Sequence, residues 1–150
     1  MKQGVNTSMI TAACNNRVMS NLLLERKALG EALPAPEKIV TVDKAFLEDV
    51  RRSLYAGKIA AYAQGFSLYR SAASTYNWQL DFGKIAAIFR AGCIIQAEFL
   101  NKITEAYQRQ PQLANLMLDE FFMQKIQENL PSLRRIVSLA IANGVPVPAL

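Results

Sequence analysis

Residues 47–73 read LEDVRRSLYAGKIAAYAQGFSLYRSAA, and this stretch decides the fold class of the 150-residue chain. Its apolar side chains recur at steps of three and four residues, through Tyr55, Ile59, Tyr62, Phe66, Tyr69 and Ala73. Steps of that size place side chains on one face of an α-helix. Asp43 is a suitable N-cap, and Thr75 to Trp78 forms a suitable exit. The pattern therefore predicts one helix of about thirty residues.

Weaker forms of the same repeat predict helices on either side of this stretch. Before it, we expect a helix over residues 8–29 that ends at Gly30, and then a loop over residues 31–39, where two prolines forbid helix. After it, we expect helices that start near Asp81, Ile94, Pro111 and Phe122. Because no segment alternates apolar and polar residues with period two, the predicted fold class is all-α, with five to seven helices.

Two breaks are expected in the second half of the chain. Arg90-Ala91-Gly92 should interrupt the helix that starts near Asp81. Pro131 lies inside the last predicted helix, where it should cause a kink or start a new helix. Gly144 is a suitable C-cap for that last helix, and two further prolines stop the chain from continuing it.

The composition excludes several kinds of site and partner. The chain has no histidine, which removes Ser-His-Asp and Cys-His nucleophile systems, His-ligated zinc and a histidine general base. Its 17 Lys and Arg exceed its 12 Asp and Glu, but the basic residues are scattered among acidic ones, so we expect no nucleic-acid partner. The longest uncharged runs, residues 3–16 and 136–150, are too short to span a membrane. Cys14 and Cys93 are expected to be buried thiols in a reducing, cytoplasmic compartment, although a disulfide stays open.

Arg17 is the strongest candidate binding residue. It follows Asn15-Asn16 in a predicted helix that has no acidic residue before Glu25. Its guanidinium must therefore find a partner across the fold, in solvent or on a ligand, and its planar fork suits phosphate. Ordinary surface or interhelix pairing of Arg17 is the alternative.

Other charged residues have structural explanations. The carboxylate pairs at residues 48–49 and 119–120 are adjacent rather than one helical turn apart, so no metal or acid–base role is expected for them. Arg90 lies at a predicted helix break, where a cation stabilises a helix C-terminus. The seven glycines are too dispersed to form a phosphate loop. These patterns predict a helical domain that is able to bind an anion, and no more.

Six segments with a specific sequence follow one another along the chain. They are residues 54–66 (LYAGKIAAYAQGF), Tyr76-Asn77-Trp78 with Leu80-Asp81-Phe82-Gly83, residues 88–95 (IFRAGCII), Phe99-Leu100 with Lys102-Ile103, Asn115-Leu116 with Leu118-Asp119 and Phe121-Phe122, and residues 143–148 (NGVPVP). Together they resemble the decarboxylating 6-phosphogluconate dehydrogenases. The resemblance covers essentially the whole chain and implies part of the multi-helix C-terminal domain of that family, incomplete at both ends.

The resemblance also implies a reaction and its parts. Members of the family are cytoplasmic oxidoreductases of the pentose phosphate pathway, which oxidise 6-phosphogluconate with NADP and decarboxylate the product to ribulose 5-phosphate. An N-terminal Rossmann domain holds the NADP, and a lysine and a glutamate act as base and acid. The helical domain supplies substrate-phosphate ligands and most of the dimer interface, and a C-terminal tail of the partner subunit adds an arginine and a histidine. We therefore expect 6-phosphogluconate as the ligand and a homodimer as the assembly.

Arg17 is the one functional residue that carries over from the family. Residues 4–17 align without gaps with the segment that ends in a phosphate-binding arginine, although Asn6, Ala12 and Asn15 replace an expected proline, acid and aromatic residue. The Rossmann domain, the catalytic lysine and glutamate, and the C-terminal tail are expected outside these 150 residues. The resemblance thus implies no catalytic, cofactor or metal residue here, and no turnover by this chain alone.

Two other functions remain open. The first is a non-catalytic helical module that acts only by dimerisation, because the small residues in 55–73 and 89–92 would allow close helix packing between chains. Gly57 and Gly65 each cost about 1 kcal/mol inside a helix, so we expect another helix backbone to approach them. The second is a nucleic-acid binder, which only the net charge of +5 favours. If flanking segments are missing, apolar faces should be exposed and the chain should oligomerise or aggregate.

Overall fold

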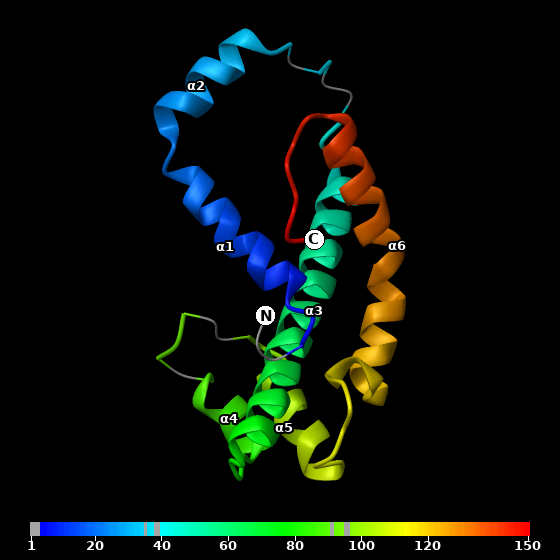
Figure 1. The fold of residues 1–150 in the computed structure, drawn as a ribbon. Helices are drawn as coiled ribbons and strands as arrows, with labels where there is room; N and C mark the ends of the chain where they lie inside the picture. Colours follow the sequence, from blue (N-terminus) through cyan, green and yellow to red (C-terminus); the bar gives the residue numbers. More distant parts are fainter. Residues whose placement is uncertain (1–3, 35, 38–39, 91, 95–96) are drawn as a thin grey trace. The chain divides into compact units, whose positions relative to one another are not determined.

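The computed structural model describes residues 4–34, 36–37, 40–90, 92–94 and 97–150. Within these residues the chain contains six α-helices, one 3-10 turn and no strand, which confirms the predicted all-α class (Figure 1). The elements are α1 (Ser8–Ser20), α2 (Leu23–Ala32), α3 (Lys44–Tyr76), α4 (Phe82–Ile88), α5 (Leu100–Arg109), the 3-10 turn η1 (Leu116–Leu118) and α6 (Glu120–Ala142). No described helix is both long enough and apolar enough to cross a bilayer.

The long helix α3 is the element that the sequence predicts best. At its start the backbone N–H of Phe46 donates to Asp43 Oδ1 at 2.8 Å, so Asp43 is the predicted N-cap. At its end Asn77 adopts a φ of 54°, and the N–H of Trp78 donates to the carbonyl of Ala73 at 2.9 Å. This left-handed residue and six-residue hydrogen bond form a Schellman motif, which closes the helix where the sequence predicted its exit.

The chain forms two compact units, and residues Ile59–Ile126 make up most of the first. Its core is an aromatic cluster centred on Phe66, whose ring contacts those of Tyr69, Phe82 and Tyr107 at centroid distances of 5.2 to 6.3 Å. The helices α4 and α5 pack closely, and Thr104 Oγ1 donates to the Gly83 carbonyl at 3.2 Å. Phe66 is 1% exposed, so this unit buries large apolar surface of its own.

Residues Thr7–Lys58 and Gln127–Leu150 make up the second unit. Its buried side chains are small or polar: Ser53, Ala56, Asn129, Ser132 and Asn143. A polar contact joins α3 to α6 inside this unit, because Asp49 accepts hydrogen bonds from Ser132 Oγ at 2.7 Å and from two nitrogens of Arg135 at 2.6 and 2.8 Å. The helices α1 and α2 belong to this unit, and neither contains a buried residue.

The prediction of one helix over residues 8–29 is wrong. The helix ends at Ser20, a turn follows at Asn21 and Leu22, and α2 continues past Gly30 to Ala32. Ser20 and Asn21 are poor helix formers, and no buried apolar stripe holds the two halves in one line. The predicted loop over residues 31–39 therefore begins later than expected, and three of its residues, 35 and 38–39, lie outside the described part of the chain.

Three further boundaries differ from those predicted. The helix expected from Ile94 begins at Leu100, and residue 91 of the expected break and residues 95–96 lie outside the described part of the chain. The helix expected from Pro111 is reduced to the three residues of η1. A new helix does not start at Pro131, because α6 runs through it as a single element. Gly144 has a φ of 68° and the N–H of Val145 donates to Ala140 O, which confirms the predicted C-cap.

Candidate functional site

Arg17 lies in the last turn of α1 with an exposed side chain. Its Nη1 donates to Ser20 Oγ and to Asn21 Oδ1, both at 2.7 Å. Ser20 Oγ in turn donates to the Arg17 carbonyl at 2.7 Å. Within the described part of the chain no acceptor contacts Nε or Nη2, so the edge of the guanidinium that can bind a phosphate bidentately faces no protein group.

This arrangement lies at the C-terminal end of α1. The N–H groups of Asn21 and Leu22 donate to the carbonyls three residues earlier, each at 3.1 Å, which tightens the end of α1. The side chains of Ser20 and Asn21 follow Arg17 by three and four residues, which is one helical turn, and so lie within its reach. Sequence reasoning selected Arg17 but did not consider these two partners, although side chains three and four residues apart are neighbours on a helix.

A second guanidinium meets the same turn. Arg26, in α2, donates from Nη1 to the Ser20 carbonyl at 3.3 Å. Neither Arg17 nor Arg26 forms an ion pair with a carboxylate within the described residues, although Glu25 is adjacent to Arg26 in the sequence. We refer to Arg17, Ser20, Asn21 and Arg26 as the arginine turn. The bonds of the exposed Arg17 to Ser20 and Asn21 are surface pairing, the alternative that the sequence left open, and they leave its role as a phosphate ligand a proposal.

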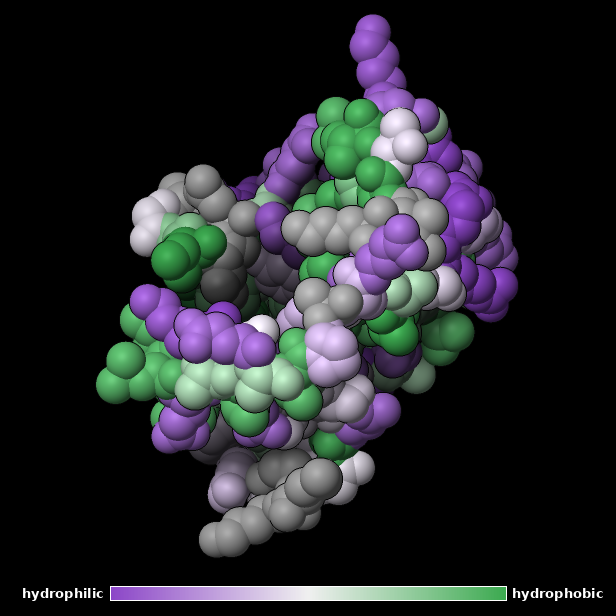
Figure 2. Space-filling view, turned by 90° about the horizontal axis from the view of Figure 1, so that it is seen from above, coloured by the Kyte–Doolittle hydropathy of each residue, from purple (hydrophilic) through white to green (hydrophobic). Residues whose placement is uncertain are grey.

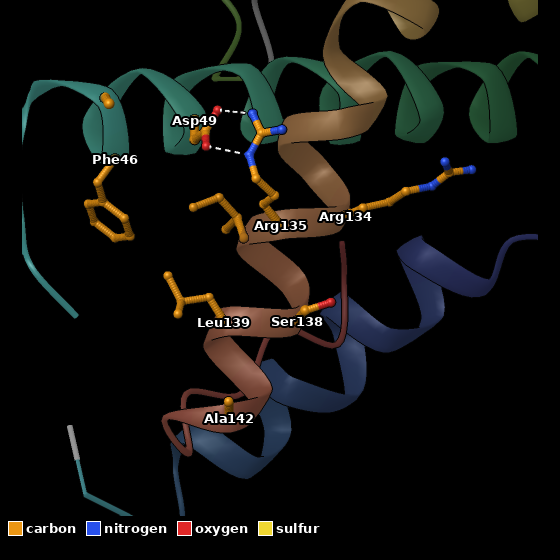
Figure 3. Close-up of a pocket in the computed structure, with 9 residues that line it drawn as sticks. Phe46, Asp49, Arg134, Arg135, Ser138, Leu139 and Ala142 are labelled. Atoms are coloured by element: carbon orange, nitrogen blue, oxygen red, sulfur yellow. Dashed lines mark hydrogen bonds and ion pairs between the residues drawn. The ribbon is translucent and has the colours of Figure 1, made fainter. Parts of the chain in front are cut away.

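A pocket lies elsewhere, on the second unit. It is an open pocket of about 750 Å³ between the beginning of α3 and the last half of α6, with Phe46, Leu139 and Ala142 among its mostly apolar lining residues (Figure 3). The guanidinium of Arg135 faces Asp49 at its edge, whereas Arg134 points away (Figure 3). Hydrogen bonds from Arg135 and then Ser132 lower the pKa of Asp49 to about 2, so this carboxylate is anionic at neutral pH.

The acidic residues that the sequence placed in pairs serve separate structural contacts. Glu48 accepts hydrogen bonds from Arg51 and Arg52 on its own helix, and these bonds lower its pKa to about 2. Asp119 accepts a bond from Arg109 Nη2 at 2.5 Å. Within the described residues no three potential metal ligands of the His, Cys, Asp and Glu types come together. Three of these four carboxylates, Glu48, Asp49 and Asp119, accept hydrogen bonds from arginines.

Arg90 and the two cysteines complete the set of sequence candidates. Arg90 Nε donates to the Ala87 carbonyl at 3.3 Å and its Nη1 to Asn101 Oδ1 at 2.8 Å, so it has the predicted structural role at a helix end. Both cysteines are free thiols, but Cys14 is exposed and Cys93 is half-buried, so the prediction of two buried thiols is wrong. Cys14 is exposed because α1 buries none of its residues.

The prediction that another helix backbone approaches Gly57 and Gly65 is wrong at both positions among the described residues. A Cβ at Gly57 would lie 2.6 Å from Leu150 Cδ2, so a side chain, and not a helix backbone, approaches Gly57. Nothing among the described residues lies within 4 Å of a Cβ placed at Gly65. Among the described residues, neither glycine therefore lies against the backbone of another helix.

Comparisons with known proteins give one consistent result. The model of the family "6-phosphogluconate dehydrogenase, C-terminal domain" matches residues 1–150. Decarboxylating 6-phosphogluconate dehydrogenases of Escherichia coli (strain K12) and Shigella dysenteriae are 49% identical over 146 residues, which is 97% of this chain and 31% or 33% of theirs. The chain thus spans about a third of the length of the curated relatives that it matches.

A solved structure shares the fold. It is Plasmodium falciparum 6-phosphogluconate dehydrogenase, described in its apo form, in complex with its cofactor NADP+ and in complex with its substrate 6-phosphogluconate. The match has a TM-score of 0.90 and 34% sequence identity, and it covers 99% of this chain and 32% of that one. The resemblance inferred from the six sequence segments is therefore confirmed.

Proposed function

Because the chain belongs to the family of 6-phosphogluconate dehydrogenase C-terminal domains, we propose that it supplies the substrate-phosphate part of such an enzyme, with Arg17 as a ligand. The observation that carries this proposal is the match of the family model over all 150 residues. The exposed guanidinium of Arg17, whose Nε–Nη2 edge has no partner within the described residues, supports it. A phosphate held there would orient a sugar acid without taking part in its oxidation.

The oxidative decarboxylation itself needs a cofactor site, and we propose that the described residues do not form one. Dinucleotide cradles place a glycine-rich turn between a strand and a helix, and the described residues contain no strand. These residues therefore do not fit NADP, and no hydride-transfer step is assigned to them. In our proposal the cofactor and the catalytic base and acid are supplied from outside this chain, the chain alone is inactive, and its location is cytoplasmic.

A titration with two ligands tests the role of Arg17. We expect the chain to bind 6-phosphogluconate more tightly than gluconate, which has the same carbon chain without the phosphate. We expect Arg17→Ala to weaken 6-phosphogluconate binding about tenfold, because a charge-assisted contact is lost, and to leave gluconate binding unchanged. Chemical-shift titration by NMR measures both ligands. Arg134→Ala is the matched control, since it removes an exposed arginine from α6.

Two outcomes would contradict the proposal. If 6-phosphogluconate and gluconate bound equally tightly, the chain would not recognise the phosphate group. Reduction of NADP by the purified chain with 6-phosphogluconate would contradict its inactivity alone, and absorbance at the nicotinamide band detects that reduction.

Association through apolar surface is the second candidate function. Large side chains on α1, α2 and the turn between them are exposed, with Leu24 at 81% and Val18 at 65%. Hydrophobic groups also reach the surface between hydrophilic ones on the face drawn in Figure 2. We propose that the chain forms a homodimer or larger oligomer, because burying such surface is favourable. Light scattering checks this, and a strictly monomeric folded species would count against it.

A further inference from the structure

We propose that Arg26 is a second ligand of the phosphate site, so that Arg17 and Arg26 bind one phosphate monoester dianion at the arginine turn. This inference rests on the proposed function of Arg17 and extends it to a residue in the next helix. The juxtaposition that carries it is at Ser20, whose side chain accepts a bond from Arg17 and whose carbonyl accepts a bond from Arg26.

The hydrogen bonds leave the same part of each guanidinium available. Arg17 and Arg26 both use Nη1 for their contacts within the turn. Within the described residues neither Nε nor Nη2 of either arginine has an acceptor. The Nε–Nη2 edge is the geometry that binds two oxygens of a phosphate. Two such edges held at one serine therefore offer up to four donors to a single anion.

Electrostatics favours a second arginine beside Arg17 in the proposed site. Arg17 lies at the C-terminal end of α1, where the helix dipole contributes about half a negative charge. That partial charge opposes an anion and offsets about half of the charge of Arg17. A phosphate monoester carries close to two negative charges above pH 7. Arg26 restores the positive charge, and neither arginine is neutralised by an ion pair within the described residues.

Ser20 and Asn21 act as positioning residues in this site. Their two oxygens hold Arg17 Nη1, and the bond from Ser20 Oγ to the Arg17 carbonyl fixes the serine as well. Holding a long side chain before the ligand arrives lowers the entropy that binding must pay. An aspartate at position 21 would instead form an ion pair with Arg17 and compete with the phosphate.

The test uses the full chain and two probes at low salt: inorganic phosphate and 6-phosphogluconate. We expect Arg26→Ala to weaken the binding of both about fivefold and Arg26→Lys to give a smaller loss, because lysine keeps the charge without the forked edge. We expect Arg26→Ala to lower the salt dependence of binding, since one fewer cation contacts the anion. Asn21→Asp should weaken binding more than Asn21→Ala. Circular dichroism checks that α2 remains helical in each variant.

Two controls separate this inference from simpler explanations. Arg134→Ala changes the net charge by the same amount far along the sequence, and we expect no loss from it. Asn16→Ala removes a polar side chain of α1 that donates to the Ala12 carbonyl and does not contact Arg17. If Arg134→Ala and Arg26→Ala lowered the affinity for phosphate equally, net charge alone would explain the effect, and the inference would be overturned.

The outcomes distinguish this inference from the proposed function. If Arg17→Ala loses affinity for both probes and Arg26→Ala does not, the role of Arg26 is overturned and the proposed function stands. If neither variant loses affinity, both fall. If inorganic phosphate binds as expected and 6-phosphogluconate does not, the turn is a site for free phosphate, and the sugar-acid part of the proposed function fails.

Discussion

Within residues Ile59–Ile126 the buried side chains include Phe66, Ile103 and Phe122, whereas the described residues of the other unit bury only small or polar ones such as Ser53 and Ser132. Burying a large apolar side chain contributes about 1.5–3 kcal/mol, and a serine contributes none of that. The first unit therefore has a hydrophobic core of its own. In the second unit several large apolar residues, such as Leu24, are exposed, and others, such as Phe46 and Leu139, are half-buried.

The strongest test of this comparison is Phe66→Ala. Phe66 is at the centre of the aromatic cluster, so its truncation removes three ring contacts and leaves a cavity. We expect a loss of about 3–5 kcal/mol in the free energy of unfolding, measured by urea denaturation. Leu68→Ala, two residues further along α3 and 37% exposed, is the control and should cost far less. Equal losses from both would show that the cluster does not stabilise the unit.

Glycine substitutions give a smaller effect with opposite signs in the two units. Gly144 has a φ of 68°, and a Cβ there would lie 2.6 Å from the rigid ring of Pro36. We expect Gly144→Ala to cost about 1–2 kcal/mol in unfolding free energy. Gly65→Ala, inside α3 with open space around the new Cβ, should stabilise by up to about 1 kcal/mol. Thermal unfolding measures both, and a stabilising Gly144→Ala would contradict the left-handed cap.

Asp49 tests whether polar contacts replace a hydrophobic core in the second unit. Its pKa falls from 3.8 to about 2 in the folded chain because Arg135 and Ser132 donate to it. Its contribution to stability is therefore present above pH 4 and is lost as the pH falls towards 2. We expect Asp49→Asn to lower the unfolding midpoint at pH 7 and to leave little difference at pH 2. Glu48→Gln, which removes pairs within α3 only, is the control.

The smallest effect on stability is expected at the exposed surface of α2. Leu24 is 81% exposed, so Leu24→Gln should change the unfolding free energy by less than about 0.5 kcal/mol. The same change should reduce self-association, because it removes apolar surface. Light scattering at several concentrations compares the self-association of the unchanged chain with that of Leu24→Gln. A large loss of stability in this variant would mean that the Leu24 side chain is buried in the folded chain, which would contradict the difference between the two units.

At the arginine turn, the sequence predicted some residues of the candidate site and not others. Arg17 was selected as a candidate because no acid lies near it in the sequence and because the resemblance aligns it with a phosphate-binding arginine. Ser20 and Asn21 were not considered, although residues three and four positions after Arg17 are its neighbours on a helix. Arg26 was missed because a continuous helix over residues 8–29 would place it about two and a half turns after Arg17, on the opposite face. The turn at Asn21 and Leu22 cannot be predicted from apolar repeats, because α1 and α2 bury no residue and so leave no repeat that marks it.

The sequence by itself determined the all-α class, the ends of α3 and the cap at Gly144, because each depends on local spacing or on one residue's backbone preference. The family membership also followed from residue order alone. Only the tertiary structure decided that Arg26 meets Arg17 at Ser20 and that Asp49 joins α6. Those contacts depend on where separate segments lie in space, and no local pattern encodes that position.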